Sequence, residues 1–135
     1  MSFPFDPSSR LIRVPVVLVG RSGPLKLMFA LDTGCSRTCA SEITIRRLGY
    51  DTGLIPRTKT VRAATGLGTF GEVEIFSLAT LGVTWDNPSI AFRELGTPRV
   101  DGLLGLDFFR GQILTVDFVR GTVALVRPWR RLFRR

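Results

Sequence analysis

Histidine is absent from this sequence of 135 residues. Its absence excludes Ser-His-Asp and Cys-His catalysis, together with every metal site that needs an imidazole ligand. Cysteine is scarce, because the chain holds only Cys35 and Cys39, and two thiolates cannot complete a four-ligand zinc site. We therefore expect no metal, and any chemistry must use carboxylates, hydroxyls or one of these thiols.

Long apolar runs are also missing. No stretch reaches the roughly 18 residues that a membrane-spanning helix needs, and residues 1–10 lack the apolar core of a signal peptide. The longest apolar stretches, Val14–Val19 and Leu27–Leu31, have the length of strands. Without a secretory signal, we expect both cysteines to stay reduced and the protein to be cytoplasmic.

Acidic residues are outnumbered by basic ones, 11 against 19, which gives a net charge of +8. Five arginines lie within residues 127–135, so the rest of the chain carries only 14 − 11 = +3. This Arg-rich tail, with Trp129 and Phe133, is compatible with weak contact to nucleic acid or to an anionic membrane surface. A solvated terminus is the simpler interpretation, because screened surface attraction does not by itself make a specific site. We therefore expect no nucleic-acid partner.

The length fits one domain, which we place at residues 1–126, before the tail. Short runs with strand character recur between turn signals, at Leu11–Val19, Leu25–Leu31, Ser89–Leu95, Gln112–Val119 and Thr122–Val126. One helix is predicted at Ser41–Leu48, with Ser41 as its cap and Gly49 as the residue that ends it. The sequence therefore predicts a mainly-β fold, a small barrel or a sandwich, with one or two short helices.

A β-hairpin with a glycine-rich tip is predicted near the middle of the chain. Lys59–Ala64 and Thr69–Ala79 have the alternation of strands and flank residues 65–68. Residues 66–71 also match the dinucleotide-binding pattern G-x-G-x-x-G, but that mechanism needs a helix after the third glycine. Glu72–Ile75 instead alternates polar and apolar residues, as a strand does, so we expect a hairpin and no cofactor.

One carboxylate stands at a distinctive position, because Asp32-Thr33-Gly34 directly follows the apolar strand Leu27–Leu31. A charge at the end of a buried strand is costly unless hydrogen bonds compensate, and Gly34 lets a tight loop turn backbone N–H groups toward the carboxylate. Such a carboxylate is a candidate for acid–base catalysis. A plain turn aspartate is the alternative, since Asp-x-Gly is common after strands.

A second segment favours catalysis. About 70 residues after Asp32, Val100–Phe109 joins a short apolar strand to a short helix. Together, Phe29–Ser36 and Leu103–Gly105 resemble the retropepsin-like aspartic proteases, a family that pairs an apolar-Asp-Thr-Gly loop with a downstream apolar-apolar-Gly motif. The resemblance covers about residues 11–126 and is greater to the cellular and bacterial members than to the viral ones.

The resemblance implies a closed-barrel acid-protease fold with a β-hairpin flap, and a role for each motif. Asp32 would be the catalytic carboxylate, Thr33 would lock two active-site loops together, and Gly34 would permit the turn. The loop would be supported from beneath by Leu103, Leu104 and Gly105. The flap that closes over the substrate would include Ala64, Thr65 and Gly66.

Peptide hydrolysis by carboxylates needs two of them, because one group cannot act as the base toward water and the acid toward the peptide nitrogen in the same turnover. The chain repeats Asp-Thr-Gly at Asp51–Gly53, but only 19 residues after Asp32 and after a predicted helix end. We therefore expect Asp51 to lie in a surface turn and the second catalytic carboxylate to be Asp32 of another copy. This requirement predicts a homodimer.

The function that follows is an aspartic endopeptidase acting on extended polypeptides. Two alternatives remain open at this point. One is a catalytically inactive member of the fold that binds peptides or proteins, and the other is a basic protein that binds nucleic acid or membrane surfaces through residues 127–135. Substitution of Asp32 separates the first alternative from the enzyme, and removal of the tail tests the second.

Overall fold

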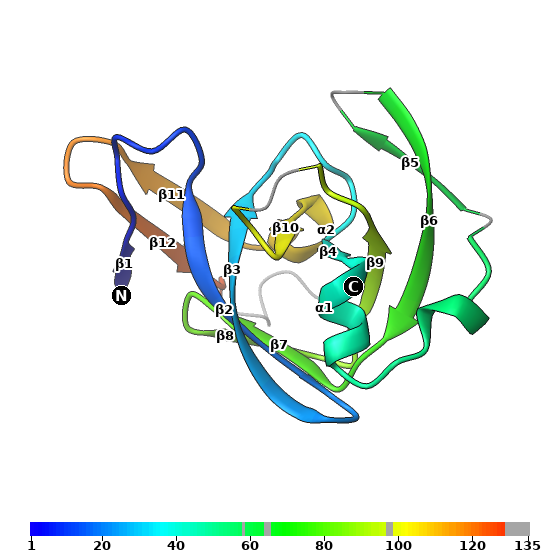
Figure 1. Ribbon diagram of the computed structural model, residues 1–135. Helices are drawn as coiled ribbons and strands as arrows, with labels where there is room; N and C mark the ends of the chain where they lie inside the picture. The colour runs from blue at the N-terminus through cyan, green and yellow to red at the C-terminus, as the bar shows by residue number, and fades with distance from the viewer. Residues whose placement is uncertain (58, 64–65, 97–98, 129–135) are drawn as a thin grey trace.

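The computed structural model describes residues 1–128 except 58, 64–65 and 97–98, and the side chains of residues 59–68 are also left undescribed (Figure 1). Its elements, in chain order, are β1 (Ser2–Pro4), β2 (Arg13–Gly20), β3 (Gly23–Leu31), β4 (Cys39–Ser41), α1 (Glu42–Arg47), the 3₁₀ turn η1 (Thr52–Leu54), β5 (Lys59–Ala63), β6 (Gly66–Glu74), β7 (Ser77–Thr80), β8 (Val83–Asp86), β9 (Ser89–Arg93), β10 (Gly102–Leu104), α2 (Leu106–Phe109), β11 (Ile113–Asp117) and β12 (Thr122–Val126). The predicted mainly-β fold with short helices is confirmed. Within these residues, no helix has the length and apolarity to cross a membrane.

The described strands form two sheets. The larger sheet has the strand order β5-β6-β9-β4-β10-β3-β2-β7-β8, and the smaller sheet has the order β1-β12-β11. In Figure 1 the hairpin of β5 and β6 lies at one side of the molecule and the smaller sheet at the other. Closure into the expected barrel would need hydrogen bonds between the two edge strands, β5 and β8, and the described strands form an open sheet instead. Among the described strands, β5 pairs with β6 alone and β8 with β7 alone.

The centre of the larger sheet follows from alternation along two neighbouring strands. β2 and β3 pair as an antiparallel hairpin, as predicted, and Val14 and Leu18 of β2 are fully buried. Phe29 of β3 is fully buried against Gly102 of β10, where a β-carbon would also meet the Cys39 carbonyl oxygen at 2.6 Å. Burying an aromatic side chain contributes roughly 1.5–3 kcal/mol to the free energy of unfolding. This packing fixes β10 beside β3.

Helix α1 is the helix predicted from its end signals. The Ser41 hydroxyl accepts a hydrogen bond from the Thr44 N–H at 3.2 Å, and Glu42 occupies the first turn. Ile45 is fully buried, and Gly49, just after the helix, has a φ of +97°, a conformation that favours glycine. Local chemistry therefore determines where this helix begins and ends.

Two details of the predicted central hairpin differ from the structure. Gly66–Gly68 belong to β6, where they pair with Val61–Ala63, so these glycines do not form a loop at the tip. The predicted strand Thr69–Ala79 is divided between β6 and β7, because the chain changes partners between them. β6 pairs with β9, whereas the Phe76 N–H donates to the Val19 carbonyl oxygen at 2.9 Å and β7 pairs with β2.

Candidate active site

The Asp32 loop, residues 32–38, begins where β3 ends. The backbone N–H of Asp32 donates to the Leu104 carbonyl oxygen at 2.9 Å, and the Cys35 N–H donates to the Asp32 carbonyl oxygen at 3.1 Å. One carboxylate oxygen, Asp32 Oδ1, accepts the Gly34 N–H at 3.0 Å. Asp32 is half-buried, whereas its neighbours Thr33 and Gly34 are exposed. The loop therefore holds the carboxylate in a defined orientation at the surface of the sheet's end.

The apolar-apolar-Gly segment lies directly beside this loop. β10 runs parallel to β3, with Leu103 opposite Ala30 and Leu104 opposite Leu31. Leu104 is fully buried and Leu103 is half-buried, because successive side chains of a strand point to opposite faces of the sheet. The two motifs singled out in the sequence, about 70 residues apart, are therefore neighbours in the fold.

Gly105 is a point of close approach between the two segments. A β-carbon at this position would lie 2.6 Å from the Arg37 carbonyl carbon and 2.8 Å from the Cys35 carbonyl oxygen. The Gly105 N–H donates to Thr38 Oγ1 at 3.1 Å, and the Leu106 N–H donates to the Cys35 carbonyl oxygen at 2.9 Å. The two segments thus pack backbone to backbone, which leaves no room for a side chain here.

Sequence reasoning missed a polar network that adjoins the loop. Thr38 is fully buried, and its N–H and its hydroxyl both donate to Asp107 Oδ1 at 2.7 Å. Arg37 lies 3.4 Å from Asp107 Oδ2 and 3.0 Å from Glu72 Oε1. Partial burial opposes the charge of the guanidinium, but the hydrogen bond with Glu72 and the two carboxylate charges raise the pKa of Arg37 overall. The signal for this network was a carboxylate within the apolar run Leu106–Phe109.

The second Asp-Thr-Gly is a surface turn, as predicted. Asp51 is exposed, and its Oδ1 accepts the Gly53 N–H at 3.1 Å while the residue caps η1. The tripeptide therefore makes the same local contact at both places. Only at Asp32 does it follow a nine-residue strand, with Leu27, Phe29 and Ala30 buried near its end, and lie against a second segment of the chain.

The predicted flap is described only in part. Ala64 and Thr65 lie outside the described residues, and Gly66 is the first residue of β6, paired with Ala63. Further along β6, Gly71 pairs with Phe92 of β9, which joins the hairpin to the sheet. Figure 1 shows this hairpin on the side of the molecule that also holds α1 and β9.

Both cysteines are fully buried free thiols. The Cys35 thiol donates to the Arg37 carbonyl oxygen at 3.1 Å. Burial raises the pKa of the Cys39 thiol to about 11. Burial therefore hides both sulfur atoms from solvent, and for Cys39 it also suppresses the thiolate that oxidants and alkylating reagents attack.

We expect both thiols to resist alkylation in the folded protein. A pKa of about 11 leaves roughly one Cys39 in ten thousand as thiolate at pH 7, and Cys35 is equally inaccessible. Mass spectrometry after treatment with iodoacetamide should show unmodified protein under native conditions and two modified cysteines in guanidinium. Rapid modification of the native protein at either position would contradict the burial seen here.

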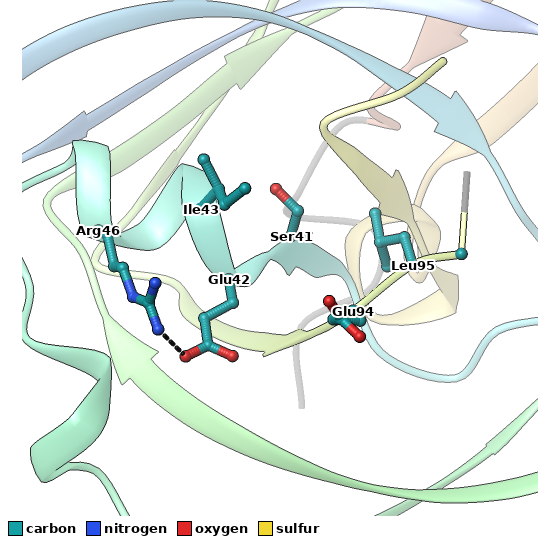
Figure 2. A pocket seen from close by; sticks show the side chains of 7 residues that line it. Ser41, Glu42, Ile43, Arg46, Glu94 and Leu95 are labelled. Atoms are coloured by element: carbon teal, nitrogen blue, oxygen red, sulfur yellow. Dashed lines mark hydrogen bonds and ion pairs between the residues drawn. The ribbon is translucent and has the colours of Figure 1, made fainter. Parts of the chain in front are cut away.

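A cavity of about 400 Å³ adjoins α1. It is lined by Ser41, Glu42, Ile43, Arg46, Glu94, Leu95 and Gly96 (Figure 2). Hydrogen bonds from Arg57 and Thr52 hold the pKa of Glu42 below its usual range, so this carboxylate is ionised and already paired. The cavity does not include the Asp32 loop or β10 in its lining.

Among the described residues, no group of three His, Cys, Asp or Glu side chains is placed to hold a metal ion.

Comparisons with known proteins address the whole arrangement. A sequence model of the family described as "gag-polyprotein putative aspartyl protease" matches residues 21–111. The crystal structure of a retropepsin-like aspartic protease from Rickettsia conorii has a TM-score of 0.66 at 16% identity, covering 93% of this chain and 91% of that chain. The retroviral protease-like domain of Ddi1 from Leishmania major has a TM-score of 0.49 at 12% identity, covering 89% of this chain and 96% of that chain. No curated protein sequence matches this chain.

The matched region runs from the turn between β2 and β3 to just beyond α2. It contains the Asp32 loop, the hairpin of β5 and β6, and the Leu103–Gly105 segment, and it spans well over half of the chain. The similarity to the Rickettsia structure extends over nearly all of both chains and shows the fold. The chain therefore belongs to the gag-polyprotein aspartyl protease family and has the retropepsin-like fold.

Proposed function

We propose that the protein is an aspartic endopeptidase that acts as a homodimer, with Asp32 of each subunit as the catalytic carboxylate. The observation that carries the proposal is the contact between the Asp-Thr-Gly loop and the apolar-apolar-Gly segment. The Asp32 N–H donates a hydrogen bond to the Leu104 carbonyl oxygen at 2.9 Å, and the Gly34 N–H donates one to Asp32 Oδ1 at 3.0 Å. Membership of an aspartyl protease family supports the same chemistry.

Two subunits are needed because each supplies one suitable carboxylate. Asp51, in the second Asp-Thr-Gly, is an exposed turn residue with a local role in capping η1. Two carboxylates about 3 Å apart share a single proton, since both cannot be ionised at that distance. The pair formed by Asp32 and Asp32 of the partner subunit then contains one base and one acid at the same time.

The reaction follows from this shared proton. The ionised carboxylate accepts a proton from water as the water oxygen bonds to the peptide carbonyl carbon, and the protonated carboxyl donates its proton to the carbonyl oxygen. The tetrahedral intermediate then collapses: the C–N bond breaks, the leaving nitrogen takes a proton from one carboxyl, and a hydroxyl proton returns to the other carboxylate. The products are a carboxylic acid and an amine, and the pair regains its single proton.

The neighbouring residues support this chemistry in distinct ways. Gly34 orients the carboxylate through its N–H. In the proposed dimer the exposed Thr33 contacts the partner's loop through its hydroxyl. Leu103–Gly105 hold the loop from behind. The hairpin of β5 and β6 closes over an extended polypeptide, which binds mainly through main-chain hydrogen bonds.

The smaller sheet supports the homodimer. Among the described strands, β11 pairs with β12 on one side, and its other edge is unpaired. Ile113 of β11 and Val126 of β12 are 56% and 53% exposed, although they belong to strands. An unpaired strand edge with apolar side chains readily pairs with another chain, so this sheet offers a surface for the second subunit.

Initial rates of cleavage of a peptide mixture test the proposal between pH 3 and 8. At low protein concentration the rate should rise with the square of the concentration, because only the dimer is active. The rate should also rise and then fall with pH, because the pair works only while it holds one proton. A rate that stays proportional to concentration far below the dimerisation range, with a plateau above neutral pH, would contradict the paired-carboxylate mechanism.

A further inference from the structure

Arg37 joins three elements of the chain. Its Nη2 lies 3.0 Å from Glu72 Oε1 on β6 and donates to the Ser89 carbonyl oxygen on β9 at 3.2 Å. Its Nε lies 3.4 Å from Asp107 Oδ2 on α2, and its guanidinium lies 5.8 Å from the centre of the Phe70 ring. The side chains of Arg37, Glu72 and Asp107 are 28%, 21% and 21% exposed. These contacts therefore form a shielded network rather than an isolated surface ion pair.

Asp107 connects this network to the Asp32 loop. Its Oδ1 accepts the N–H and the hydroxyl of Thr38, each at 2.7 Å, and Thr38 Oγ1 accepts the Gly105 N–H at 3.1 Å. The residue before Gly105 is Leu104, whose carbonyl oxygen holds the Asp32 N–H at 2.9 Å. A continuous series of contacts thus runs from strand β6 through Arg37 to the candidate catalytic residue.

We propose that Arg37 is a positioning residue that fixes the Asp32 loop against β6, the strand that carries the flap hairpin. This inference rests on the proposed function and assigns a further residue to it. Arg37 acts through Asp107 and Thr38 rather than on the reacting atoms. Because a displacement of about 1 Å at a reacting group can lower a rate by about 100-fold, loss of this bridge should appear in kcat.

Arginine suits the bridge better than lysine does. Its planar guanidinium presents five N–H donors in a fixed fork, so one side chain can meet two carboxylates and a backbone carbonyl oxygen together. Lysine has a single ammonium group and holds its partners as a point charge without that geometry. Arg37→Lys should therefore restore part of the function that a neutral side chain loses.

Steady-state kinetics of four variants and one control variant test the proposal. Arg37→Met should lower kcat of the folded dimer about 10- to 100-fold with KM within about threefold, and Arg37→Lys should fall between it and the wild type. Asp107→Asn keeps an acceptor for Thr38 but removes the charge facing Arg37, so it should also lower kcat. The double variant Arg37→Met/Asp107→Asn should be no slower than Arg37→Met, because both changes remove the same contact, the one between Arg37 and Asp107. Arg21→Met, which removes the exposed guanidinium that lies 5.1 Å from the centre of the Tyr50 ring, is the control and should keep the wild-type kcat.

Amide hydrogen exchange provides a second readout that does not depend on catalysis. In Arg37→Met the N–H groups of Cys35 and Gly105 should exchange at least about tenfold faster, while the amides of the β2–β3 hairpin keep their protection. If the wild-type protein cleaves no peptide, the proposed function fails, and the exchange rates still decide whether Arg37 holds the loop.

Two results would overturn the inference. One is a wild-type kcat in Arg37→Met together with unchanged exchange at Gly105. The other is uniformly faster exchange throughout the chain with an unchanged kcat per folded dimer, which would make Arg37 a residue of general stability only. If Arg37→Met does not fold, Arg37→Lys and Asp107→Asn carry the same comparison against Arg21→Met.

Discussion

Replacement of Asp32 by asparagine is expected to lower peptide cleavage by about 10⁴-fold while leaving the fold intact. Asparagine has the shape of aspartate and keeps an oxygen that can accept the Gly34 N–H, which lies 3.0 Å from Asp32 Oδ1. It cannot take up or release the catalytic proton. In a homodimer the substitution removes both members of the pair, so the base and the acid are lost together. Cleavage of a diverse peptide mixture by the wild type and the variant, side by side from pH 3 to 8, measures the effect.

The chain contains a matched control for this substitution. Asp51 belongs to the same tripeptide and accepts the Gly53 N–H at 3.1 Å, as Asp32 accepts that of Gly34. Because Asp51 lies in an exposed turn that caps η1, Asp51→Asn should cleave peptides at the wild-type rate. Equal losses in both variants would exclude a special role for Asp32. A wild type that binds peptides without cleaving them, unaffected by Asp32→Asn, would establish a binding module on this fold.

The elements that the sequence predicts well are those determined by neighbouring residues. The tight loop at Asp32 is predicted because an apolar strand, a carboxylate and a glycine follow one another directly, whereas its catalytic role is predicted only with the second segment, Val100–Phe109. The ends of α1 were recognised for the same reason, since Ser41 and Gly49 satisfy the helix termini through contacts within a few residues. The hydrogen bonds within the Asp32 loop and at the start of the helix span two and three residues, so a short stretch of sequence is enough to predict these local features.

The Arg37 network could not be predicted in this way. Arg37 meets Glu72 across 35 residues, and Thr38 meets Asp107 across 69. Those contacts depend on how β4, β6 and β9 are paired, and a shift of one residue in a pairing turns every side chain of a strand to the other face. The open sheet has a similar origin, because barrel closure depends on twist and stagger accumulated over all the strands and not on any local motif.

Gly105→Ala is expected to lower the free energy of unfolding by about 3 kcal/mol and to remove activity with it. Gly105 has a φ of −100° and a ψ of −176°, an extended conformation that any residue adopts, so the cost is not one of backbone conformation. The cost is steric, because the new β-carbon would lie 2.6 Å from the Arg37 carbonyl carbon and 2.8 Å from the Cys35 carbonyl oxygen. Backbone atoms cannot rotate away as a side chain does. Residues 35–38 must therefore move relative to β10, and Asp32 moves with them.

Urea unfolding measures this effect, with Gly53→Ala as the control. A β-carbon at Gly53 would meet Asp51 Oδ1 at 3.3 Å and no other atom within 4 Å, so its free energy of unfolding should change by less than about 0.5 kcal/mol. Gly105→Ala should lower the unfolding midpoint without changing the dependence on urea concentration, because the folded and unfolded states expose the same surfaces as before. Wild-type stability in Gly105→Ala would show that residues 35–38 yield at little cost. The close backbone packing would then not be what holds the Asp32 loop, and the rigidity proposed for the catalytic carboxylate would lose its physical basis.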